Sequence, residues 1–283
     1  SMSENRDPQL SKVERSVHQA LEEDIGLGDV TGELIHPSLS QAASLISREE
    51  SILCGSKWFE TAFTILDPNI EIIWNQEEGT LIEPDSEVAR IKGNAKSMVA
   101  AERTGLNFLQ MMSGIAYKTY LYQKYLAGSN TRLLDTRKTL PGLRYEQKYS
   151  VLIGGGQNHR MGLYDAALIK ENHISSSGSI ENAISTLKQN GVSTIEVEVE
   201  NLVQLDDAIK FKADIAMLDN FDDDDLLKAS QLAKGKIKLE VSGNITLDDI
   251  SKLKSLNIDY ISSGDLTKNI TATDYSLIFK PLD

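Results

Sequence analysis

Residues 194–219 read TIEVEVENLVQLDDAIKFKADIAMLD, and this stretch decides the fold. Two short apolar runs, Thr194–Glu200 and Asp214–Asp219, flank a segment with helical spacing of its apolar residues, Leu202–Lys212. A strand, a helix and a second strand in this order predict a βαβ unit, in which both strands lie parallel in one sheet.

The same alternation fills the second half of the chain. The other apolar runs are Thr131–Asp135, Ala166–Lys170, Ile237–Val241 and Asp259–Ser263, and the other helical segments are Ser179–Gln189, Asp223–Ala233 and Thr246–Leu256. Thr246 and Asp249 have the spacing of a capping box. Six runs are too few for a regular eight-stranded (β/α) barrel, so the pattern leaves open a shortened barrel and an open doubly wound sheet.

The first half has a different texture. Its apolar spacing predicts a helix over Lys12–Glu23, with Ser11 as the cap and Gly26 as the stop. Ser97–Leu126 lacks proline and predicts one helix or two, with Gly114 at a kink or break. A small, mainly antiparallel unit is predicted from the β-type runs Ser44–Arg48, Ile70–Trp74 and Glu87–Ile91.

Composition narrows the function classes. The 283 residues carry 29 Lys and Arg against 42 Asp and Glu, a net charge of −13, which disfavours nucleic acid and anionic membrane surfaces as partners. The single cysteine, Cys54, excludes an intrachain disulfide and a cysteine-based zinc cluster and favours a reducing compartment. No apolar stretch approaches the ~20 residues of a membrane span. We therefore expect a soluble, cytoplasmic protein.

The scarce cations include a cluster in the segments where the predicted strands end. The cations considered are Arg137, Lys138, Arg144, His159, Arg160 and Lys170, together with Arg103 in the predicted helix Ser97–Leu126. Active sites of (β/α) barrels lie at the carboxyl ends of the strands, so these side chains predict an anion site inside an acidic protein. The alternative is that each cation forms a surface ion pair, a contact that stabilises a protein by only ~0–1 kcal/mol.

Carboxylates form a second set. Glu196, Glu198 and Glu200 alternate along one predicted strand and therefore point to one side of the sheet, where they need cations or solvent. Asp219 ends the next apolar run. Magnesium, the cluster of cations, or both would meet this need. The alternative is an edge strand whose acidic face is exposed to solvent.

Two glycine turns follow late strands, Ser242-Gly243-Asn244 and Ser263-Gly264-Asp265. Such turns commonly bind phosphate through main-chain N–H groups, although a glycine there often serves turn geometry alone. Gly154-Gly155-Gly156 lacks the spacing of a dinucleotide fingerprint, and the sequence contains no P-loop motif. Dinucleotide-binding and P-loop folds are therefore disfavoured.

The longer motifs resemble one enzyme family, the quinolinate phosphoribosyltransferases, also called nicotinate-nucleotide pyrophosphorylases (carboxylating). The resemblance covers essentially the whole chain. It rests on DTRKTLPGLR at 135–144, GGGQNHRMGL at 154–163, LIKENHI at 168–174, Glu196–Glu200, MLDNF at 217–221 and EVSGNI at 240–245, and upstream on Glu23-Asp24, GDVT at 28–31, AERT at 101–104, NFL at 107–109 and SGIA at 113–116.

The resemblance implies an α/β fold with an N-terminal α/β sandwich domain and a C-terminal open-faced (β/α) barrel of fewer than eight strands. We expect residues 1–116, joined by the tail 269–283, to form the first domain, and residues 117–268 to form the phosphoribosyltransferase barrel. The implied reaction converts quinolinate and 5-phosphoribosyl 1-pyrophosphate (PRPP) into nicotinate mononucleotide, pyrophosphate and carbon dioxide in de novo NAD synthesis. Mg²⁺ is the implied cofactor, and a homodimer or a dimer-based hexamer with shared active sites is the implied assembly.

The resemblance also implies roles for individual residues. The quinolinate carboxylates would be bound by Arg103 of a partner subunit and by Thr136, Arg137, Lys138, His159, Arg160 and Lys170. PRPP and its phosphates would be bound by Lys138, Lys170, Glu198, Asp219, Ser242, Gly243, Asn244, Ser263, Gly264 and Lys268. The catalytic set would be Lys138, Lys170, Glu198 and Asp219, with magnesium arriving on PRPP and lying near Glu198 and Asp219.

One stretch departs from the family pattern. After Ser263-Gly264 the chain reads Asp265-Leu266-Thr267-Lys268, where many relatives have a small residue and then Leu-Thr-His. An acid beside a phosphate turn is unfavourable unless its carboxylate points away. Two other functions stay open from the sequence: a relative on the same fold, such as a molybdenum-transport-associated ModD protein or a nicotinate-specific phosphoribosyltransferase, and a non-catalytic module that binds anionic metabolites.

Overall fold

The computed structural model describes residues 6–161 and 165–281, and its chain forms two compact units. The first unit takes in the chain up to Tyr120, the segment Tyr145–Gly155 and the chain from Ile270. The second unit comprises Leu121–Arg144 and Gly156–Asn269. The division expected from the sequence, 1–116 with 269–283 against 117–268, differs from these units mainly in residues 145–155.

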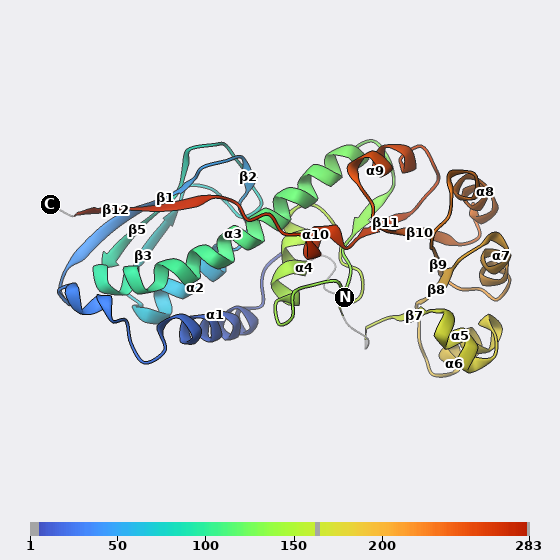
Figure 1. Cartoon of the computed structure of the whole chain (residues 1–283), viewed down its shortest axis with the longest axis horizontal. Helices are drawn as coiled ribbons and strands as arrows, with labels where there is room; N and C mark the ends of the chain where they lie inside the picture. The colour runs from blue at the N-terminus through green and yellow to red at the C-terminus, as the bar shows by residue number, and fades with distance from the viewer. Residues whose placement is uncertain (1–5, 162–164, 282–283) are drawn as a thin grey trace. The chain divides into compact units, whose positions relative to one another are not determined.

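The first unit is built around an antiparallel sheet of four strands in the order β12-β1-β5-β3. Figure 1 shows its helices α1, α2 and α3 gathered on one side of that sheet. The elements of this unit are α1 (Leu10–Ile25), the 3-10 helix η1 (Thr31–Leu34), β1 (Ser40–Ser47), β2 (Ser51–Ile52), α2 (Ser56–Leu66), β3 (Glu71–Trp74), β4 (Leu81–Ile82), β5 (Ser86–Asn94), α3 (Ala95–Leu126), α4 (Arg144–Ile153) and β12 (Tyr275–Pro281). The expected antiparallel unit is confirmed.

The predicted first helix is present, but its start is different. Helix α1 begins after Gln9, which makes no side-chain cap, so the prediction of Ser11 as the cap is wrong. Val13, Val17 and Leu21 are buried on one face of the helix, as their spacing predicts. Gly26 ends it with φ +56°, a conformation that glycine adopts without steric cost.

Helix α3 is continuous from Ala95 to Leu126, so the expected break at Gly114 is wrong. The glycine has another role, because a Cβ at this position would overlap the carbonyl oxygen of Thr271. Gly114 therefore allows the C-terminal segment of the chain to pass directly against the helix.

Helix α4 has no counterpart among the predicted elements. Trp58 of α2 packs against the Tyr149 ring, with the ring centroids 4.9 Å apart. The Tyr149 hydroxyl donates a hydrogen bond to Glu78 at 2.6 Å. All residues from Glu146 to Ile153 are buried, so this helix lacks the polar face that reveals a surface helix in a sequence.

The second unit contains all six predicted parallel strands and the predicted helices between them. Its elements are β6 (Arg132–Leu134), β7 (Ala167–Ile169), α5 (Glu171–Ser177), α6 (Ile180–Gln189), β8 (Ile195–Val199), α7 (Leu202–Lys210), β9 (Ile215–Leu218), α8 (Asp223–Ala233), β10 (Lys238–Gly243), α9 (Leu247–Leu253), β11 (Tyr260–Ser263) and α10 (Asp265–Lys268). Every strand pair in this sheet is parallel. The capping box of Thr246 and Asp249 is confirmed at the start of α9.

Strand order decides between the two architectures that the sequence left open. The sheet runs β6-β11-β10-β9-β8-β7, so each strand from β8 to β11 lies beside the one before it. A doubly wound sheet reverses direction at a switch point and carries helices on both faces, whereas this order winds in one direction. Figure 1 shows α5–α9 on the outer side of the strands. The unit is therefore an open barrel, with β6 and β7 at its two edges.

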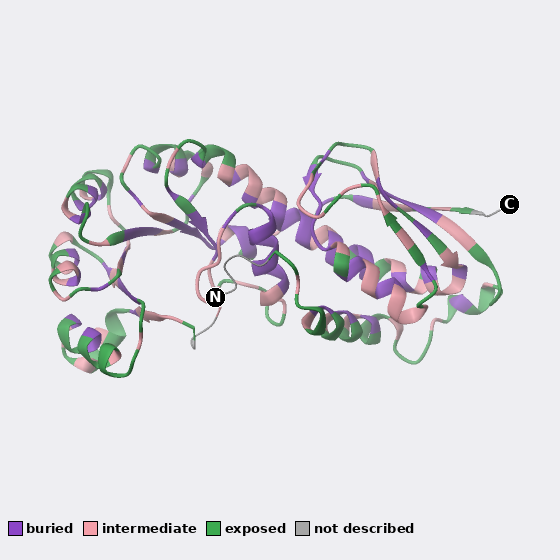
Figure 2. Ribbon diagram, turned by 180° about the vertical axis from the view of Figure 1, so that it is seen from behind, coloured by how far each residue is buried: buried purple, intermediate pink, exposed green. Residues whose placement is uncertain are grey.

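The two faces of this sheet differ in chemistry. Residues facing the helices are apolar and buried, among them Val197, Ala216 and Leu239, and Figure 2 shows this burial along the strands. The residues between them face the inside of the barrel. On that inner face, registers place Glu198 beside Met217 and Met217 beside Glu240. Carboxylates on an inward face indicate a site for ligands instead of a packed core.

Candidate active site

The carboxyl ends of the parallel strands bring most of the predicted site residues to one edge of the second unit. Lys170 directly follows β7, Glu198 is the penultimate residue of β8, and Asp219 follows β9. Ser242 and Gly243 end β10, Asn244 follows it, and Gly264 follows β11, while Thr136, Arg137 and Lys138 lie in the loop after β6. His159 and Arg160 lie in the loop that leads to β7. Glu200 lies beyond the end of β8 and is exposed.

Arg137 and Arg160 are close enough for their charges to interact. Burial lowers the pKa of Arg160, and the neighbouring Arg137 lowers it further, whereas Glu196 raises it. The Nε of Arg137 is buried and has no hydrogen-bond partner within the described residues. Two adjacent guanidinium groups with an unused buried donor form a site that favours a carboxylate ligand, because a planar carboxylate accepts hydrogen bonds from two N–H groups at once.

Arg144, the other arginine of this loop, serves the protein backbone. Its guanidinium donates to the carbonyl oxygens of Arg137 at 3.3 Å and Met161 at 3.1 Å, and to the Thr139 hydroxyl at 3.0 Å. Arg144 therefore holds the loop that carries Arg137, which agrees with a structural role and not with ligand binding.

Glu198, Asp219 and Lys170 lie together. Burial raises the pKa of Glu198, the nearby Asp219 raises it further, and Lys170 lowers it. Because β8 is an interior strand of the sheet, the alternative of an acidic edge strand is wrong. Two carboxylates in contact repel one another, and a divalent cation relieves that repulsion, so oxygen donors of this kind fit magnesium.

A cavity of about 590 Å³ opens beside these strand ends. Its lining includes five predicted phosphate-binding residues, namely Lys138, Gly243, Asn244, Gly264 and Lys268. Gly243 has φ +134°, which favours glycine. A Cβ on Gly264 would come within 2.8 Å of the Lys138 side chain, so this glycine makes room for the lysine.

The departure at Asp265 is resolved by its hydrogen bonds. Its two carboxylate oxygens accept hydrogen bonds from the Tyr122 hydroxyl at 2.7 Å and from the Asn269 side chain at 2.8 Å. These two hydrogen bonds compensate the negative charge of the Asp265 carboxylate, which lies at the cavity. Ser263 lies on the face of β11 that is turned towards the helices and is fully buried, so in this geometry only its main chain is available to a ligand on the inner face.

His159 is placed differently from the other predicted quinolinate ligands. Its Nε2 lies 3.0 Å from both Glu196 Oε1 and Glu240 Oε1. Its Nδ1 accepts a hydrogen bond from the Arg160 N–H at 2.8 Å. Both ring nitrogens are thus engaged inside the protein, so the prediction of His159 as a direct ligand is not supported by this geometry.

Asp135, Glu196 and Glu240 are buried acids in contact with His159 that the predicted site left out. Asp135 accepts hydrogen bonds from the His159 N–H and from the Asn158 side chain, both at 2.7 Å. Each of the three acids interrupts or directly follows an apolar strand. This position is the feature of the sequence that could have identified them. Arg103, in contrast, lies exposed on α3 in the first unit.

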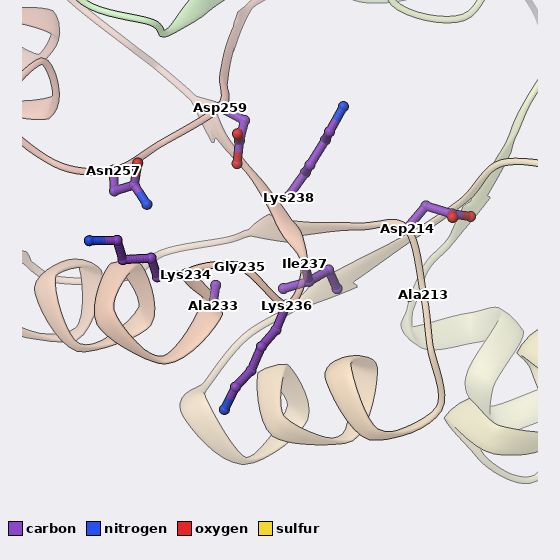
Figure 3. A pocket seen from close by; sticks show the side chains of 10 residues that line it. All are labelled: Ala213, Asp214, Ala233, Lys234, Gly235, Lys236, Ile237, Lys238, Asn257 and Asp259. Atoms are coloured by element: carbon purple, nitrogen blue, oxygen red, sulfur yellow. The ribbon is translucent and has the colours of Figure 1, made fainter.

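Another cavity, of about 380 Å³, lies at the opposite, amino ends of β9 and β10. Figure 3 shows that Lys234, Lys236 and Lys238 extend from it in different directions. Asp214 and Asp259 at its rim accept main-chain hydrogen bonds from neighbouring strands. This cavity therefore lacks the converging charges of the carboxyl edge.

Comparison with known proteins gives one consistent result. The model of the quinolinate phosphoribosyl transferase C-terminal domain matches residues 115–278, and that of the N-terminal domain matches residues 29–113. The chain belongs to the quinolinate phosphoribosyl transferase family. It is 38% identical over 257 residues to the probable nicotinate-nucleotide pyrophosphorylase (carboxylating) of Bacillus subtilis, covering 90% of this chain and 89% of the relative.

Solved structures agree with this family assignment. The nicotinate-nucleotide pyrophosphorylase of Francisella tularensis superposes with a TM-score of 0.94 at 44% identity, covering 97% of this chain and 98% of that one. Human nicotinic acid phosphoribosyltransferase, at 13% identity and a TM-score of 0.59 over 98% of this chain and 74% of that one, shares the fold alone. Of the family motif at 154–163, Gly162 and Leu163 lie outside the described residues.

Proposed function

We propose that this protein is a decarboxylating quinolinate phosphoribosyltransferase, which converts quinolinate and PRPP into nicotinate mononucleotide, pyrophosphate and carbon dioxide in NAD biosynthesis. Family membership supports the reaction class. The observation that carries the proposal is the adjacent pair Arg137 and Arg160, with a buried donor unused, on the same edge of the barrel as Glu198 and Asp219.

Quinolinate is a dianion, and its two carboxylates account for the concentration of cations. We assign them to Arg137, Arg160, Lys138, Lys170 and the Thr136 hydroxyl. Arg103 would enter the site from a second copy of the chain. Nicotinate has one carboxylate and would leave part of this positive charge unpaired, so the nicotinate-specific alternative and the ModD-like alternative are less well supported.

PRPP would occupy the cavity lined by Lys138, Gly243 and Gly264, with its ribose towards Glu198 and Asp219. The phosphates would be bound there by Ser242, Asn244 and Lys268 and by the main chain of Ser263. Glu198 and Asp219 would hold magnesium together with the substrate, since hard oxygen ligands suit this ion. Bound Mg²⁺ would neutralise the pyrophosphate leaving group.

The chemistry follows from the charges. Departure of pyrophosphate leaves a ribose carbon with oxocarbenium character, and the Glu198 and Asp219 carboxylates stabilise its positive charge while Lys138 and Lys170 stabilise the leaving anion. The ring nitrogen of quinolinate then attacks this carbon. The adjacent carboxylate leaves as carbon dioxide, because the carbanion that remains is stabilised by the positively charged nitrogen, and this carbanion then takes up a proton from solvent to give nicotinate mononucleotide.

Self-association is supported by an exposed apolar segment in the first unit. Leu27, Val30 and Leu34 are almost fully exposed, with relative accessibilities of 112%, 87% and 88% for the whole residues. Apolar side chains gathered in one exposed segment mark an interaction site. We assign this segment to contact with a second copy of the chain, in a homodimer or a dimer-based hexamer.

No helix within the described residues is long and apolar enough to span a membrane. A cytoplasmic location would suit the single free cysteine, Cys54, which is buried.

The test is a product assay with purified protein, PRPP and magnesium. Equal concentrations of quinolinate and nicotinate are supplied in separate reactions, and nicotinate mononucleotide, pyrophosphate and carbon dioxide are measured. We expect all three products from quinolinate, and no turnover after EDTA treatment until magnesium is restored. Absence of nicotinate mononucleotide from quinolinate, or faster turnover of nicotinate, would refute the proposal.

A further inference from the structure

His159 is held from both sides of its ring by groups that belong to the protein. Glu196 and Glu240 lie at Nε2, and the Arg160 N–H donates to Nδ1. The side chains of Glu196 and Glu240 are 5% and 1% exposed, so both carboxylates are buried away from solvent. The second oxygen of Glu240 accepts a hydrogen bond from the Ser262 hydroxyl at 2.9 Å.

These contacts define where the ring proton lies. At Nδ1 the ring accepts the Arg160 main-chain N–H, and a nitrogen that accepts a hydrogen bond carries no proton of its own. At Nε2 the ring faces two carboxylate oxygens, which accept hydrogen bonds, so the ring proton lies on this nitrogen. The main-chain geometry decides this point: the ring carries its proton on Nε2 and donates it to the two carboxylates.

The same contacts fix the segment that carries Arg160. Asp135 accepts the His159 main-chain N–H, and the His159 ring accepts the Arg160 main-chain N–H. Glu196 also attracts the Arg160 guanidinium, which Arg137 repels. Loss of either glutamate would therefore release the histidine ring. Loss of Glu196 would also remove a negative charge that offsets the repulsion between Arg137 and Arg160.

We propose that Glu196 and Glu240 are positioning residues for quinolinate recognition: by clamping His159 Nε2 they orient the ring that holds the Arg160 main chain, and so place the Arg160 guanidinium beside Arg137. This inference rests on the proposed function for its ligand. The clamp itself, with its Nε2-protonated ring, is a property of the free protein.

The kinetic test compares Glu196→Gln and Glu240→Gln with Glu200→Gln, a control at an exposed acid beyond the same strand. We expect the two buried variants to raise the KM for quinolinate about tenfold or more while the KM for PRPP stays within about twofold. The control should match the wild type. Equal changes in both KM values, or none, would overturn the positioning role, since a general loss of structure does not select one substrate.

A second measurement uses the free protein and needs no activity. The chain has 4 histidines, so ¹⁵N-histidine labelling gives few ring signals, and His159→Gln assigns the signal of interest. We expect a protonated Nε2 and an unprotonated Nδ1, and a loss of this pattern in Glu240→Ala. A proton on Nδ1 would overturn the clamp.

A bound metal is the rival explanation, because the ligand atoms of His159, Glu196 and Glu240 lie within 4.8 Å of one another. One equivalent of tightly bound metal in the purified protein, lost in Glu240→Ala, would overturn the proposal. An inactive wild type with the expected ring signals would refute the proposed function alone. An active wild type whose buried variants behave like Glu200→Gln would refute the positioning role alone.

Discussion

Single residues set the close contacts of this fold, and Gly114 shows how strict they are. An added Cβ there would overlap the main chain at Thr271, which has no flexible end to move aside. We expect Gly114→Ala to lower the free energy of unfolding by about 3 kcal/mol. Urea denaturation measures it. Val99→Ala on the exposed side of the same helix is the control, and equal stability of both variants would contradict this account.

Arg137 is the residue on which recognition of quinolinate depends most directly. Its removal would leave a ligand carboxylate without its donor in a partly buried site, where a hydrogen bond to a charged group contributes about 1.5–3 kcal/mol. We expect Arg137→Ala to raise the KM for quinolinate about tenfold or more and to lower kcat/KM accordingly. Steady-state kinetics with Arg132→Ala, an exposed arginine at the start of β6, provides the comparison. A change within twofold would remove Arg137 from the site.

Residue types at strand ends were enough to predict most of the candidate site, but not the roles of its buried acids. Lys170, Glu198 and Asp219 lie at the carboxyl ends of three neighbouring strands, and parallel strands bring such positions together at one edge of the sheet. The contacts of His159 with Glu196 and Glu240 join residues 37 and 81 positions apart. A pattern of neighbouring residues does not reveal contacts over such separations. The sequence therefore does not distinguish a His159 that binds a ligand from a His159 whose ring is held by two glutamates.

Among the elements, α2 depends on a carboxylate from elsewhere in the chain. Glu78 accepts hydrogen bonds from the main-chain N–H groups of Gly55 and Ser56 at the start of α2, and from the Tyr149 hydroxyl of α4. We expect Glu78→Ala to cost about 2–4 kcal/mol, because it leaves these donors unpaired. Thermal or urea denaturation tests this, with the exposed neighbour Glu77→Ala as control. A loss no larger than that of the control would contradict the capping role.

Glu78 also predicts a pH dependence of stability. Burial raises its pKa above the ordinary value of 4.5, although hydrogen bonds from Tyr149, Gly55 and Ser56 lower it. The folded protein therefore binds this proton more tightly than the unfolded chain. The stabilising contribution is complete below pH 4.5 and is lost as the pH rises through the pKa of the folded state.

The measurement is the free energy of unfolding of the wild type minus that of Glu78→Gln, taken at several pH values. We expect this difference to fall as the pH rises above 4.5, since the variant has no proton to lose. A difference that grows with pH would show that hydrogen bonding, and not burial, dominates at Glu78.

Helix α9 links an element to the phosphate cavity. Thr246 caps it reciprocally with Asp249, two residues after Asn244 of the predicted phosphate turn. Thr246→Ala should destabilise the helix by about 1 kcal/mol and loosen that turn. We expect a higher KM for PRPP and little change for quinolinate, with Ser251→Ala in the same helix as the kinetic control. An increase confined to quinolinate would be inconsistent with this assignment.

Elements with a clear period were predictable, and those without one were not. The six parallel strands follow from short apolar runs, and the cap of α9 follows from two residue types at fixed spacing. Helix α4 is buried on all sides along Glu146–Ile153, so it shows no amphipathic pattern. Strand order was undetermined because it depends on which faces pack together, and a single sequence does not reveal that.

For the whole molecule, the exposed apolar segment around Leu34 predicts how copies associate. We expect Leu34→Asp to shift the protein towards the monomer, because a charge would be buried against apolar surface. Analytical ultracentrifugation measures the shift. Val203→Asp, at a 73% exposed apolar residue of α7, is the control. An unchanged association constant would place the interface elsewhere.

The path of the chain through its two units has a consequence for the history of such proteins. The first unit is assembled from three separate segments, one of which is the α4 segment Tyr145–Gly155, and the second from two. A single recombination event between genes transfers one continuous stretch, and the shortest stretch that contains the whole second unit, residues 121–269, also contains the α4 segment of the first unit. Transfer of the barrel in one piece therefore takes the buried helix α4 away from the first unit, and any stretch that contains the whole first unit contains the barrel as well.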